Sequence, residues 1–353
     1  MKFSINRTEL ANALSIVLKG VSTRSTLPVL SGILIEAAGD KIILQATDLE
    51  LSIQYSVAAL VEEEGRTVVP GKLFSEIVKN LPDAAVHVEA TDDQAFVTCD
   101  TSSFSIRALN AEDFPGFPRV DVHQKIEIPF HQFSTMVKRV SRVVSKDESR
   151  AILTGVLITL EAGVLRMVAT DSSADEFHAV ISGSFLSEIA SLPKTESPVS
   201  LALADNQIVV TCEDTVFINR RIEGNFPNYK QLLPDGYATR ATIEVDKLVA
   251  SVRRASLLGS TSSPVRFDLN NASQTVQISA ASQDVGSAQE IISCAIEGED
   301  VEIAFNYAYV LDGLGSIATD EVYLEVQSAL KPGIFRALEP ENFLYLVMPV
   351  RIS

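Results

Sequence analysis

The chain has 353 residues, enough for two or three domains, and 46% of them are hydrophobic, which is ample for buried cores. It has no run of 18 apolar residues and no apolar stretch behind the charged start MKFSINRTEL, so neither a membrane span nor a secretory signal is predicted and a cytoplasmic location is expected. The net charge of -17 argues against a protein that coats nucleic acid with its whole surface, unless its basic residues gather on one face.

The first predicted element is an amphipathic helix over residues 8–22, with one apolar side formed by Leu10, Leu14, Val17 and Leu18. Runs rich in β-branched residues follow and predict strands over 30–36, 41–47 and 51–61. A second, shorter helix is then expected over 72–81. Three further strand patterns close this part of the chain, over 86–90, 95–100 and 103–109.

The same order of elements is predicted twice more. The second series begins with a helix over 131–146, continues with strands over 155–161 and 164–170, and has its short helix over 184–192. The third series begins with a helix over 245–260. Its strand patterns and short helix follow over 264–270, 275–281, 290–297 and 307–316.

Recurring phrases show that these series are copies of one unit. The segment 42–48 ends in Ala-Thr-Asp, as does 165–171, and a glycine stands 16 positions before each aspartate, at Gly32 and Gly155. The segment 68–82 also matches 179–193. The third copy has diverged, because Ala281-Ser282 stands where the other two read Ala-Thr-Asp.

The repeats predict an α+β protein of three similar domains, each with two helices on one side of antiparallel sheets. We expect the domains to span residues 1–121, 122–238 and 239–353. The three cysteines, Cys99, Cys212 and Cys294, have no CxxC spacing, which argues against a disulfide framework and fits a reducing compartment. Cys99 and Cys212 stand at near-equivalent repeat positions in apolar strands, which favours small core residues over metal ligands. No metal or cofactor is predicted.

The predicted first helices carry an excess of positive charge. The clearest cluster is Lys138, Arg139, Arg142, Lys146 and Arg150, and others are Lys19, Arg24, Lys247, Arg253 and Arg254. Taken singly, each helix could be an ordinary solvated face. Because the charges recur at one place in the unit, helices that share an orientation would form a basic surface suited to the phosphate backbone of duplex DNA. No ladder of aromatic residues accompanies them, so single strands are a less favoured ligand.

An enzyme would need its acidic residues to converge on one cleft, as a pair formed by Asp48 and Asp171 could. These residues lie in separate repeats, so two equivalent turns or caps are the favoured interpretation. The four histidines have no ligand spacing, and no GxSxG, P-loop or GxGxxG motif occurs. No catalytic residue is predicted.

The whole chain resembles the family of bacterial DNA sliding clamps, the beta subunits of DNA polymerase III. The resemblance rests on the order and spacing of MKFSINRTEL, TRSTLPVLSGILIE, ATDLELSI, VVPGKLFSEIVKNLP, EDFPGFP, EGNFPNYKQLLP and LVMPVRI. It implies a head-to-tail homodimer of three-domain subunits, with sheets outside and helices inside. Such a ring would encircle double-stranded DNA without reading its sequence and act as a non-catalytic processivity factor in replication.

The resemblance also implies three kinds of site. DNA would meet Arg24, Lys146 and Arg150 in or near the hole of the ring, and the basic helices add Lys138, Arg139, Arg142, Arg253 and Arg254. Phe104 and Ile106 would face Leu257 and Leu258 across the dimer boundary, although ordinary core positions are the alternative for all four. A groove for short linear motifs of the polymerase III catalytic subunit, the clamp loader, other polymerases and repair proteins would be formed by Leu153, Thr170, Pro227, Leu232, Leu346, Met348, Val350, Arg351 and Ile352.

One part of the sequence departs from the family pattern. Asp48 and Gly71 are 23 residues apart, whereas Asp171 and Gly183 are only 12 apart, so the second domain is expected to be about 11 residues short in this segment. Ala174 and Asp175 stand where the family usually has arginine and leucine. We therefore expect weaker or altered binding of the usual motif. A clamp-like paralogue with different partners, specialised away from replication, remains the alternative interpretation.

Overall fold

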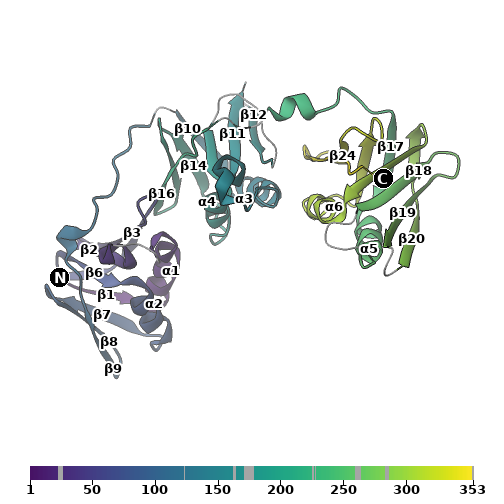
Figure 1. Cartoon of the computed structure of the whole chain (residues 1–353). Coiled ribbons are helices and arrows are strands. Elements are labelled where there is room, and N and C mark those ends of the chain that lie inside the picture. The colour runs from purple at the N-terminus through teal and green to yellow at the C-terminus, as the bar shows by residue number, and fades with distance from the viewer. Residues whose placement is uncertain are drawn as a thin grey trace. The chain divides into compact units, whose positions relative to one another are not determined.

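The computed structural model describes residues 1–22, 27–122, 124–161, 164–170, 179–224, 226, 228–258, 264–282 and 286–351 (Figure 1). The chain divides into two compact units. The first contains Met1–Val137, Leu157–Arg166 and Ala179–Glu223, and the second contains Lys138–Val156, Met167–His178 and Gly224–Ser353. None of the helices in the described ranges is long and apolar enough to cross a bilayer.

The first repeat has two antiparallel sheets and two α-helices. One sheet has the order β5(Leu60–Glu63), β1(Lys2–Asn6), β7(Ala85–Ala90), β8(Gln94–Cys99), β9(Ser102–Arg107). The other contains β4(Leu51–Ala58), β3(Lys41–Thr47), β2(Gly32–Ala38) and β6(Gly65–Pro70). The helices α1(Arg7–Val17) and α2(Gly71–Asn80) contact each other and strands of the sheets. The repeat also contains three short 3₁₀ helices, which are labelled η: η1(Leu18–Gly20), η2(Pro28–Ser31) and η3(Ala111–Asp113).

In the second repeat, β10(Gln124–Pro129), β14(Pro198–Leu203), β15(Gln207–Cys212) and β16(Thr215–Arg220) continue directly into β4, which makes one sheet of eight strands. The other sheet has three described strands, in the order β12(Val164–Val168), β11(Gly155–Glu161), β13(Ala179–Ser182). The repeat also contains α3(Phe130–Val140), η4(Glu148–Thr154) and α4(Gly183–Ala190).

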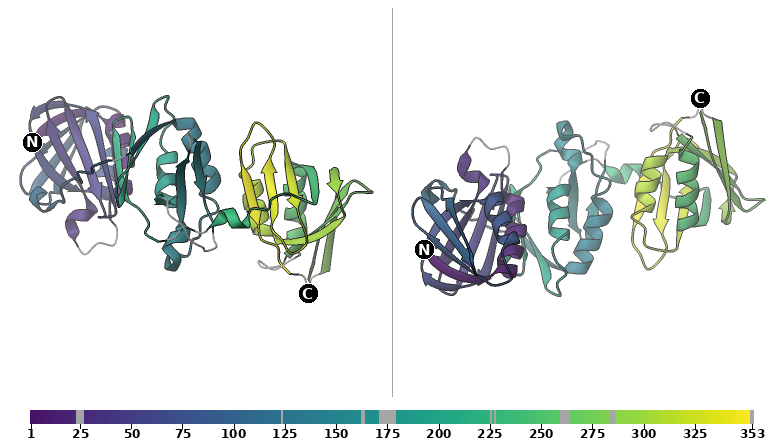
Figure 2. Two further views of the ribbon diagram at one scale, coloured as in Figure 1. Left: turned by 90° about the horizontal axis from the view of Figure 1, so that it is seen from above. Right: turned by 90° about the horizontal axis from the view of Figure 1, so that it is seen from below.

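The third repeat has sheets of five and four strands. The five-stranded sheet is β21(Ala295–Gly298), β17(Thr239–Glu244), β23(Glu321–Val326), β24(Gly333–Ala337), β25(Leu344–Val347). The four-stranded sheet is β20(Gly286–Ser293), β19(Thr275–Ser282), β18(Pro264–Asn270), β22(Val301–Asn306). The helices α5(Val245–Ser256) and α6(Tyr307–Leu314) contact each other and strands of both sheets, and η5(Tyr229–Leu232) precedes β17. Figure 2 shows the helices of this repeat side by side.

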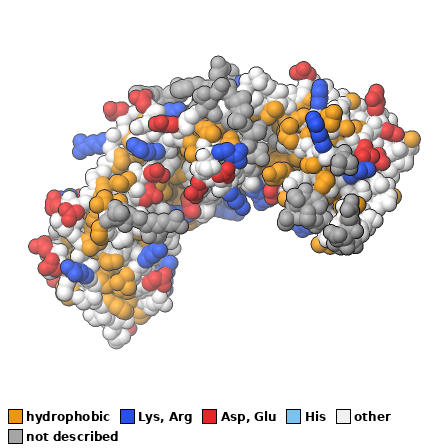
Figure 3. Space-filling model, in the orientation of Figure 1, with side chains coloured by type: hydrophobic (Ala, Val, Ile, Leu, Met, Phe, Trp, Pro, Cys, Tyr) orange, Lys and Arg blue, Asp and Glu red, His pale blue; other side chains and the backbone are white. Residues whose placement is uncertain are grey.

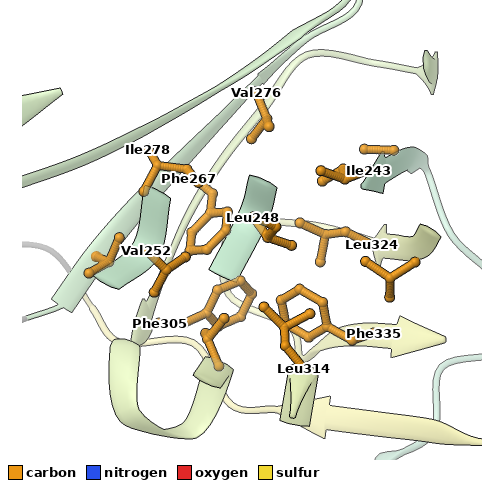
Figure 4. Packing of buried hydrophobic residues seen from close by; sticks show 14 of the residues in the cluster. Ile243, Leu248, Val252, Phe267, Val276, Ile278, Phe305, Leu314, Leu324 and Phe335 are labelled. Atoms are coloured by element: carbon orange, nitrogen blue, oxygen red, sulfur yellow. The ribbon is translucent and has the colours of Figure 1, made fainter. Parts of the chain in front are cut away.

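The core of the third repeat shows how the two sheets and the helices are joined. Phe267 and Phe305 meet edge to face with ring centroids 5.5 Å apart, and the rings of Phe305 and Phe335 lie 6.1 Å apart (Figure 4). Leu248 and Val252 of α5 lie in the same buried cluster. A Cβ at Gly333 would come within 2.4 Å of the Phe305 ring, so only glycine lets β24 pass this close.

The α+β architecture of repeated units agrees with the prediction, but the first helix of each repeat ends earlier than predicted, α1 at Val17, α3 at Val140 and α5 at Ser256. The pattern over 131–146 predicts a helix through Lys146, whereas α3 ends at Val140. The backbone N–H of Ser145 donates to the carbonyl of Leu153 at 2.8 Å, which removes this segment from a helix. The β-branched Val143 and Val144 also offer little helix propensity.

Two predicted strands are each divided between sheets. The run 51–61 forms β4 and β5, which belong to different sheets, and the backbone N–H of Ala59 between them donates to the carbonyl of Asp40 at 3.0 Å. The run 290–297 likewise continues from β20 into β21, with Cys294 between them. Hydrophobic periodicity reports which residues are buried but does not say which sheet buries them, so the breaks were not predicted.

Candidate nucleic-acid and partner interfaces

The repeated Thr-Asp pair forms a turn where it can be described. The Asp48 carboxylate accepts from the backbone N–H groups of Leu51 at 2.7 Å and Glu50 at 3.0 Å. The Thr47 hydroxyl accepts from the N–H of Leu49, whose φ of 79° is left-handed. Asp48 therefore stabilises the β3–β4 connection, which confirms the predicted structural role. Asp171 lies outside the described residues.

Two of the cysteines are core residues, as predicted. Cys99 is fully buried and Cys212 is 4% exposed. Burial, aided by the neighbouring Glu213 carboxylate, raises the pKa of Cys212 to about 11, so its thiol is protonated at neutral pH. Among the residues that the structure describes, no three His, Cys, Asp or Glu side chains are grouped as metal ligands.

The predicted DNA-binding cations fall into two classes. Lys138, Lys146 and Arg253 are exposed and have no ion-pair partner within the described ranges. Lys72 on α2, which the sequence analysis did not include in the site, has the same properties. Positive charges of this kind can meet a phosphate backbone without first giving up a protein partner. Arg24 lies outside the described residues.

The other predicted cations have partners in the protein. Arg139 is only 18% exposed, forms an ion pair in which its Nη2 lies 2.5 Å from the Glu341 carboxylate, and lies over the Phe343 ring. Arg142 donates from Nη1 to the carbonyl of Gly315 at 2.8 Å. These two side chains hold the segment after α3 against the third repeat, a structural role that sequence alone did not separate from DNA binding.

Arg150 and Arg254 are paired but exposed. Nε of Arg150 lies 3.0 Å from the Asp147 carboxylate. Arg254 forms two bonds to Glu290, at 2.9 Å from Nε and 2.6 Å from Nη2, and these bonds hold the pKa of the Glu290 carboxyl below its ordinary value. Exposed ion pairs contribute little to stability, so both guanidinium groups can exchange a carboxylate for a phosphate. On the face in Figure 3, Lys and Arg side chains lie interspersed with Asp and Glu.

The described residues of the predicted peptide groove all belong to the second compact unit. Leu153 is 2% exposed, whereas Met348 is 54% exposed. Thr170, Leu232, Leu346 and Val350 are half-buried, and Arg351 is exposed. The backbone N–H of Val350 donates to the carbonyl of Ala304 at 2.8 Å, which fixes the end of the chain beside β22. Pro227 and Ile352 lie outside the described residues.

The four predicted dimer residues differ in exposure. Leu257, just after α5, is 79% exposed, and Phe104 on β9 is 40% exposed. Leu258 is half-buried. Ile106 is only 6% exposed and packs inside its own repeat, so it offers little surface to a second chain.

Comparisons with known proteins agree along the whole chain. Models of the DNA polymerase III beta subunit match in succession: the N-terminal domain at residues 1–118, the central domain at 127–228 and the C-terminal domain at 230–351. A beta sliding clamp of Synechocystis sp. is 32% identical over 389 aligned residues, which cover all of both chains. A beta sliding clamp of Bacillus subtilis is 29% identical over 377 residues, covering 99% of this chain and 100% of that protein.

Solved structures are similar as well. The DNA polymerase sliding clamp of Bacillus subtilis matches with a TM-score of 0.94 at 28% identity, over all of both chains. A sliding clamp of Pseudomonas aeruginosa, solved with bound griselimycin, matches with a TM-score of 0.93 at 27% identity, again over all of both chains. Similarity of this extent includes all three repeats and not only one of them.

Proposed function

Because the chain belongs to the family of bacterial beta sliding clamps, the beta subunits of DNA polymerase III, we propose that it forms a ring around duplex DNA and tethers the replicative polymerase to it. The observation that carries this proposal is the match of all three domains over the full length of chain and relatives. This function requires no catalysis by the chain. We expect the protein to act in the cytoplasm, where replication takes place.

A ring needs only weak contacts with the DNA that it encloses. The link is topological, so strong phosphate binding would slow sliding and base-specific contacts would stop it. A net charge of -17 keeps most of the protein surface repelled from DNA. We assign the DNA contacts to Lys138, Lys146 and Arg253, which have no ion-pair partner among the described residues, with Arg150 and Arg254 able to exchange their carboxylates for phosphates.

The repeated architecture supports a head-to-tail homodimer. Within the chain, β16 of the second repeat pairs with β4 of the first, and Phe217 lies opposite Ile53. In the first repeat the strand that corresponds to β16 is β9. In the third repeat the strand that corresponds to β4 is β20. Neither β9 nor β20 has a second strand beside it among the described residues. Two copies can therefore pair the free backbone N–H and C=O groups of these edge strands, with β9 of one copy beside β20 of the other.

The register of that contact follows from the β16–β4 pair. Phe104 lies five residues after Cys99, as Phe217 lies five residues after Cys212. Ala288 lies opposite the buried Ala280 of β19, as Ile53 lies opposite the buried Ala46 of β3. If the dimer contact has the same register, Phe104 would lie opposite Ala288 of a second copy. Such a heterologous contact closes into a ring when its rotation is correct.

Two measurements test the ring. The solution mass should be twice the chain mass of 38.2 kDa, and protein loaded on closed circular DNA should dissociate when the circle is linearised. Residues directly opposite on antiparallel strands have Cα atoms about 4.5–5.5 Å apart, within disulfide range, so oxidised Phe104→Cys/Ala288→Cys should form a covalent dimer. Phe104→Cys/Ser293→Cys is the matched control, because five residues move the second thiol by about 17 Å. A monomer, or equal release from circles and linear DNA, would contradict the proposal.

We assign partner binding to the groove residues Leu153, Thr170, Leu232, Leu346, Met348, Val350 and Arg351, with Pro227 and Ile352 of the sequence prediction. The half-buried and exposed apolar members of this set can hold the apolar anchors of a short linear motif. Partners of this kind include the polymerase III catalytic subunit, the clamp loader, other polymerases and repair proteins.

Peptide titration should give weaker affinity than a typical clamp groove, because Ala174 and Asp175 stand where the family usually has arginine and leucine. Low-micromolar binding would contradict the expected weakening.

The second candidate is that the chain is a clamp-like paralogue with different partners and a role other than replication. The observation that favours it is the short segment of the second repeat: ten residues separate β12 from β13, whereas seventeen separate β3 from β6 in the first repeat. Those seventeen residues contain β4 and β5. Affinity capture from native lysate separates the two candidates, since recovery of the replicative polymerase supports the main proposal and capture of other proteins without it supports the paralogue.

A further inference from the structure

One face of the five-stranded sheet in the third repeat carries a cluster of charged and aromatic side chains. Arg240 on β17 lies directly opposite Glu325 on β23, and Tyr323 on β23 lies opposite Arg336 on β24. Leu324, between the two β23 residues, belongs to the buried core. Because side chains alternate along a strand, the four residues of the cluster share the face that points away from that core.

Glu325 holds both arginines of this face. Its side chain is 6% exposed, and Oε1 accepts from Nε and Nη2 of Arg240 at 3.1 Å and 2.6 Å. Oε2 accepts from the same two atoms of Arg336, at 3.1 Å and 3.0 Å. Paired bonds of this kind fix the planes of both guanidinium groups. Two positive charges face one carboxylate, so the cluster keeps an excess positive charge.

Aromatic rings restrict Arg240 further. Its Cζ lies 4.0 Å from the centre of the Tyr237 ring and 4.7 Å from the centre of the Tyr323 ring. Nη1 of Arg240 and Nη1 of Arg336 have no hydrogen-bond partner among the described residues. Both arginines are therefore held in place and still have N–H donors for a further acceptor.

The two arginines line a cavity of about 880 Å³. Residues 338–343, which connect β24 with β25, also line it and supply the apolar side chains of Pro340 and Phe343. A volume of this size suits a small ligand or a short peptide segment better than a single ion. All of the lining residues belong to the second compact unit, so the cavity needs nothing from a second chain.

The charges of the lining favour an isolated oxyanion over a polyanion. Among the described lining residues the basic ones are Arg240 and Arg336, and the acidic ones are Glu339 and Glu341. Glu341 is already paired with Arg139. A nucleic acid carries closely spaced phosphates and would bring some of them towards these carboxylates. One carboxylate or phosphate group, in contrast, matches the excess charge of the cluster.

We infer that this cavity binds an acidic segment of a partner protein, with one side-chain oxyanion held by Arg240 and Arg336 and its apolar neighbours packed against Pro340 and Phe343. The oxyanion is a carboxylate or, on a phosphorylated segment, a phosphate, since both accept paired N–H groups from arginine. The cavity shares no lining residue with the predicted peptide groove, so the two sites recognise different chemistry.

Fluorescence anisotropy with the full chain tests the site. The probe is a labelled pentapeptide, Ala-Phe-Glu-Phe-Ala, blocked at both ends, and two others have phosphoserine or glutamine at the centre. The glutamate or the phosphoserine peptide should bind at least tenfold more tightly than the glutamine peptide, because only an anion engages both arginines. The tighter of the two identifies the oxyanion. Equal binding of all three peptides would overturn the inference.

Variants locate the binding. Arg336→Gln should weaken the preferred peptide at least tenfold, and Arg336→Lys should weaken it at least fivefold, because lysine keeps the charge beside Glu325 but not the paired donors. The matched control is Arg266→Gln, which removes an exposed arginine of the same repeat that pairs with Glu302 and does not line the cavity. It should leave the affinity within twofold.

Two outcomes would contradict this assignment. Equal losses in the Arg336 and Arg266 variants, with circular dichroism showing folded protein, would mean that net charge alone attracts the peptide. Tighter binding of a single-stranded oligothymidylate, lost in Arg336→Gln, would assign the cavity to nucleic acid instead. If Arg336→Gln does not fold, the lysine variant and the three peptides still decide the matter. A monomeric chain would contradict the proposed ring and leave this test unchanged.

Discussion

The equivalent strands β16, inside a sheet, and β9, at the edge of one, carry equivalent phenylalanines in different environments. Phe217 on β16 is 1% exposed, with β4 beside its strand and the Phe185 ring packed edge to face at 6.4 Å between centroids. Phe104 on β9 is 40% exposed, and among the described residues no strand pairs with the outer edge of β9. The two strands hold the same place in their repeats, so the difference in exposure reflects what surrounds each strand and not the strand itself. It indicates that an apolar side chain left uncovered at an edge marks the place where a second chain belongs.

The largest expected effect comes from truncating these two residues in turn. Phe217→Ala should lower the free energy of unfolding by about 3–5 kcal/mol, because it opens a cavity in a packed joint. Phe104→Ala should change the unfolding of the monomer far less and weaken dimerisation instead. Urea denaturation with sedimentation analysis separates the effects, and equal losses of monomer stability would contradict the contrast.

A smaller contrast is expected between the neighbours Arg139 and Lys138. Arg139→Ala removes the partner of the half-buried Glu341 and should cost about 1–3 kcal/mol of stability. Lys138→Ala should leave stability unchanged and lower the salt slope of duplex binding, measured by fluorescence anisotropy, by about 1. If both variants altered only DNA binding, the structural role of Arg139 would be wrong.

The pair of Arg254 and Glu290 should give a weaker, pH-dependent effect. The guanidinium lowers the pKa of the Glu290 carboxyl in the folded chain, so the pair stabilises above the ordinary pKa of 4.5 and the contribution is lost as acid protonates the carboxylate. Comparing thermal unfolding of the wild type and Glu290→Gln from pH 7 to pH 3 should show curves that converge at low pH. A constant gap between them would exclude this origin.

The smallest effect concerns Cys212. Because its pKa is raised to about 11, the folded thiol should react with a disulfide reagent at pH 8 far more slowly than the same thiol in denaturant. Stability should also fall as pH rises above the ordinary value of 9, since only the unfolded chain ionises readily there. Cys212→Ser serves as the control for reaction at the other two cysteines, and equal rates in folded and denatured protein would contradict the burial.

Much of the fold could be predicted from local pattern. The apolar spacing of Leu10, Leu14 and Val17 predicts α1, and all three residues are fully buried. The pattern could not predict the end of α3, because the hydrogen bond from Ser145 to Leu153 joins segments that only the fold brings together. It could not divide β4 from β5 either, since the strand pattern continues through residues 51–61 although the two strands belong to different sheets.

The sequence by itself determined the number of repeats, the α+β class, the family and the excess of basic residues near the first helices, because these depend on composition and on spacing along the chain. Only the tertiary structure decided which cations are free. Arg139 and Lys138 are adjacent in sequence, yet one is paired with Glu341 and the other is exposed. A charge acquires its role from the groups within a few ångströms of it, and those groups are mostly distant in sequence.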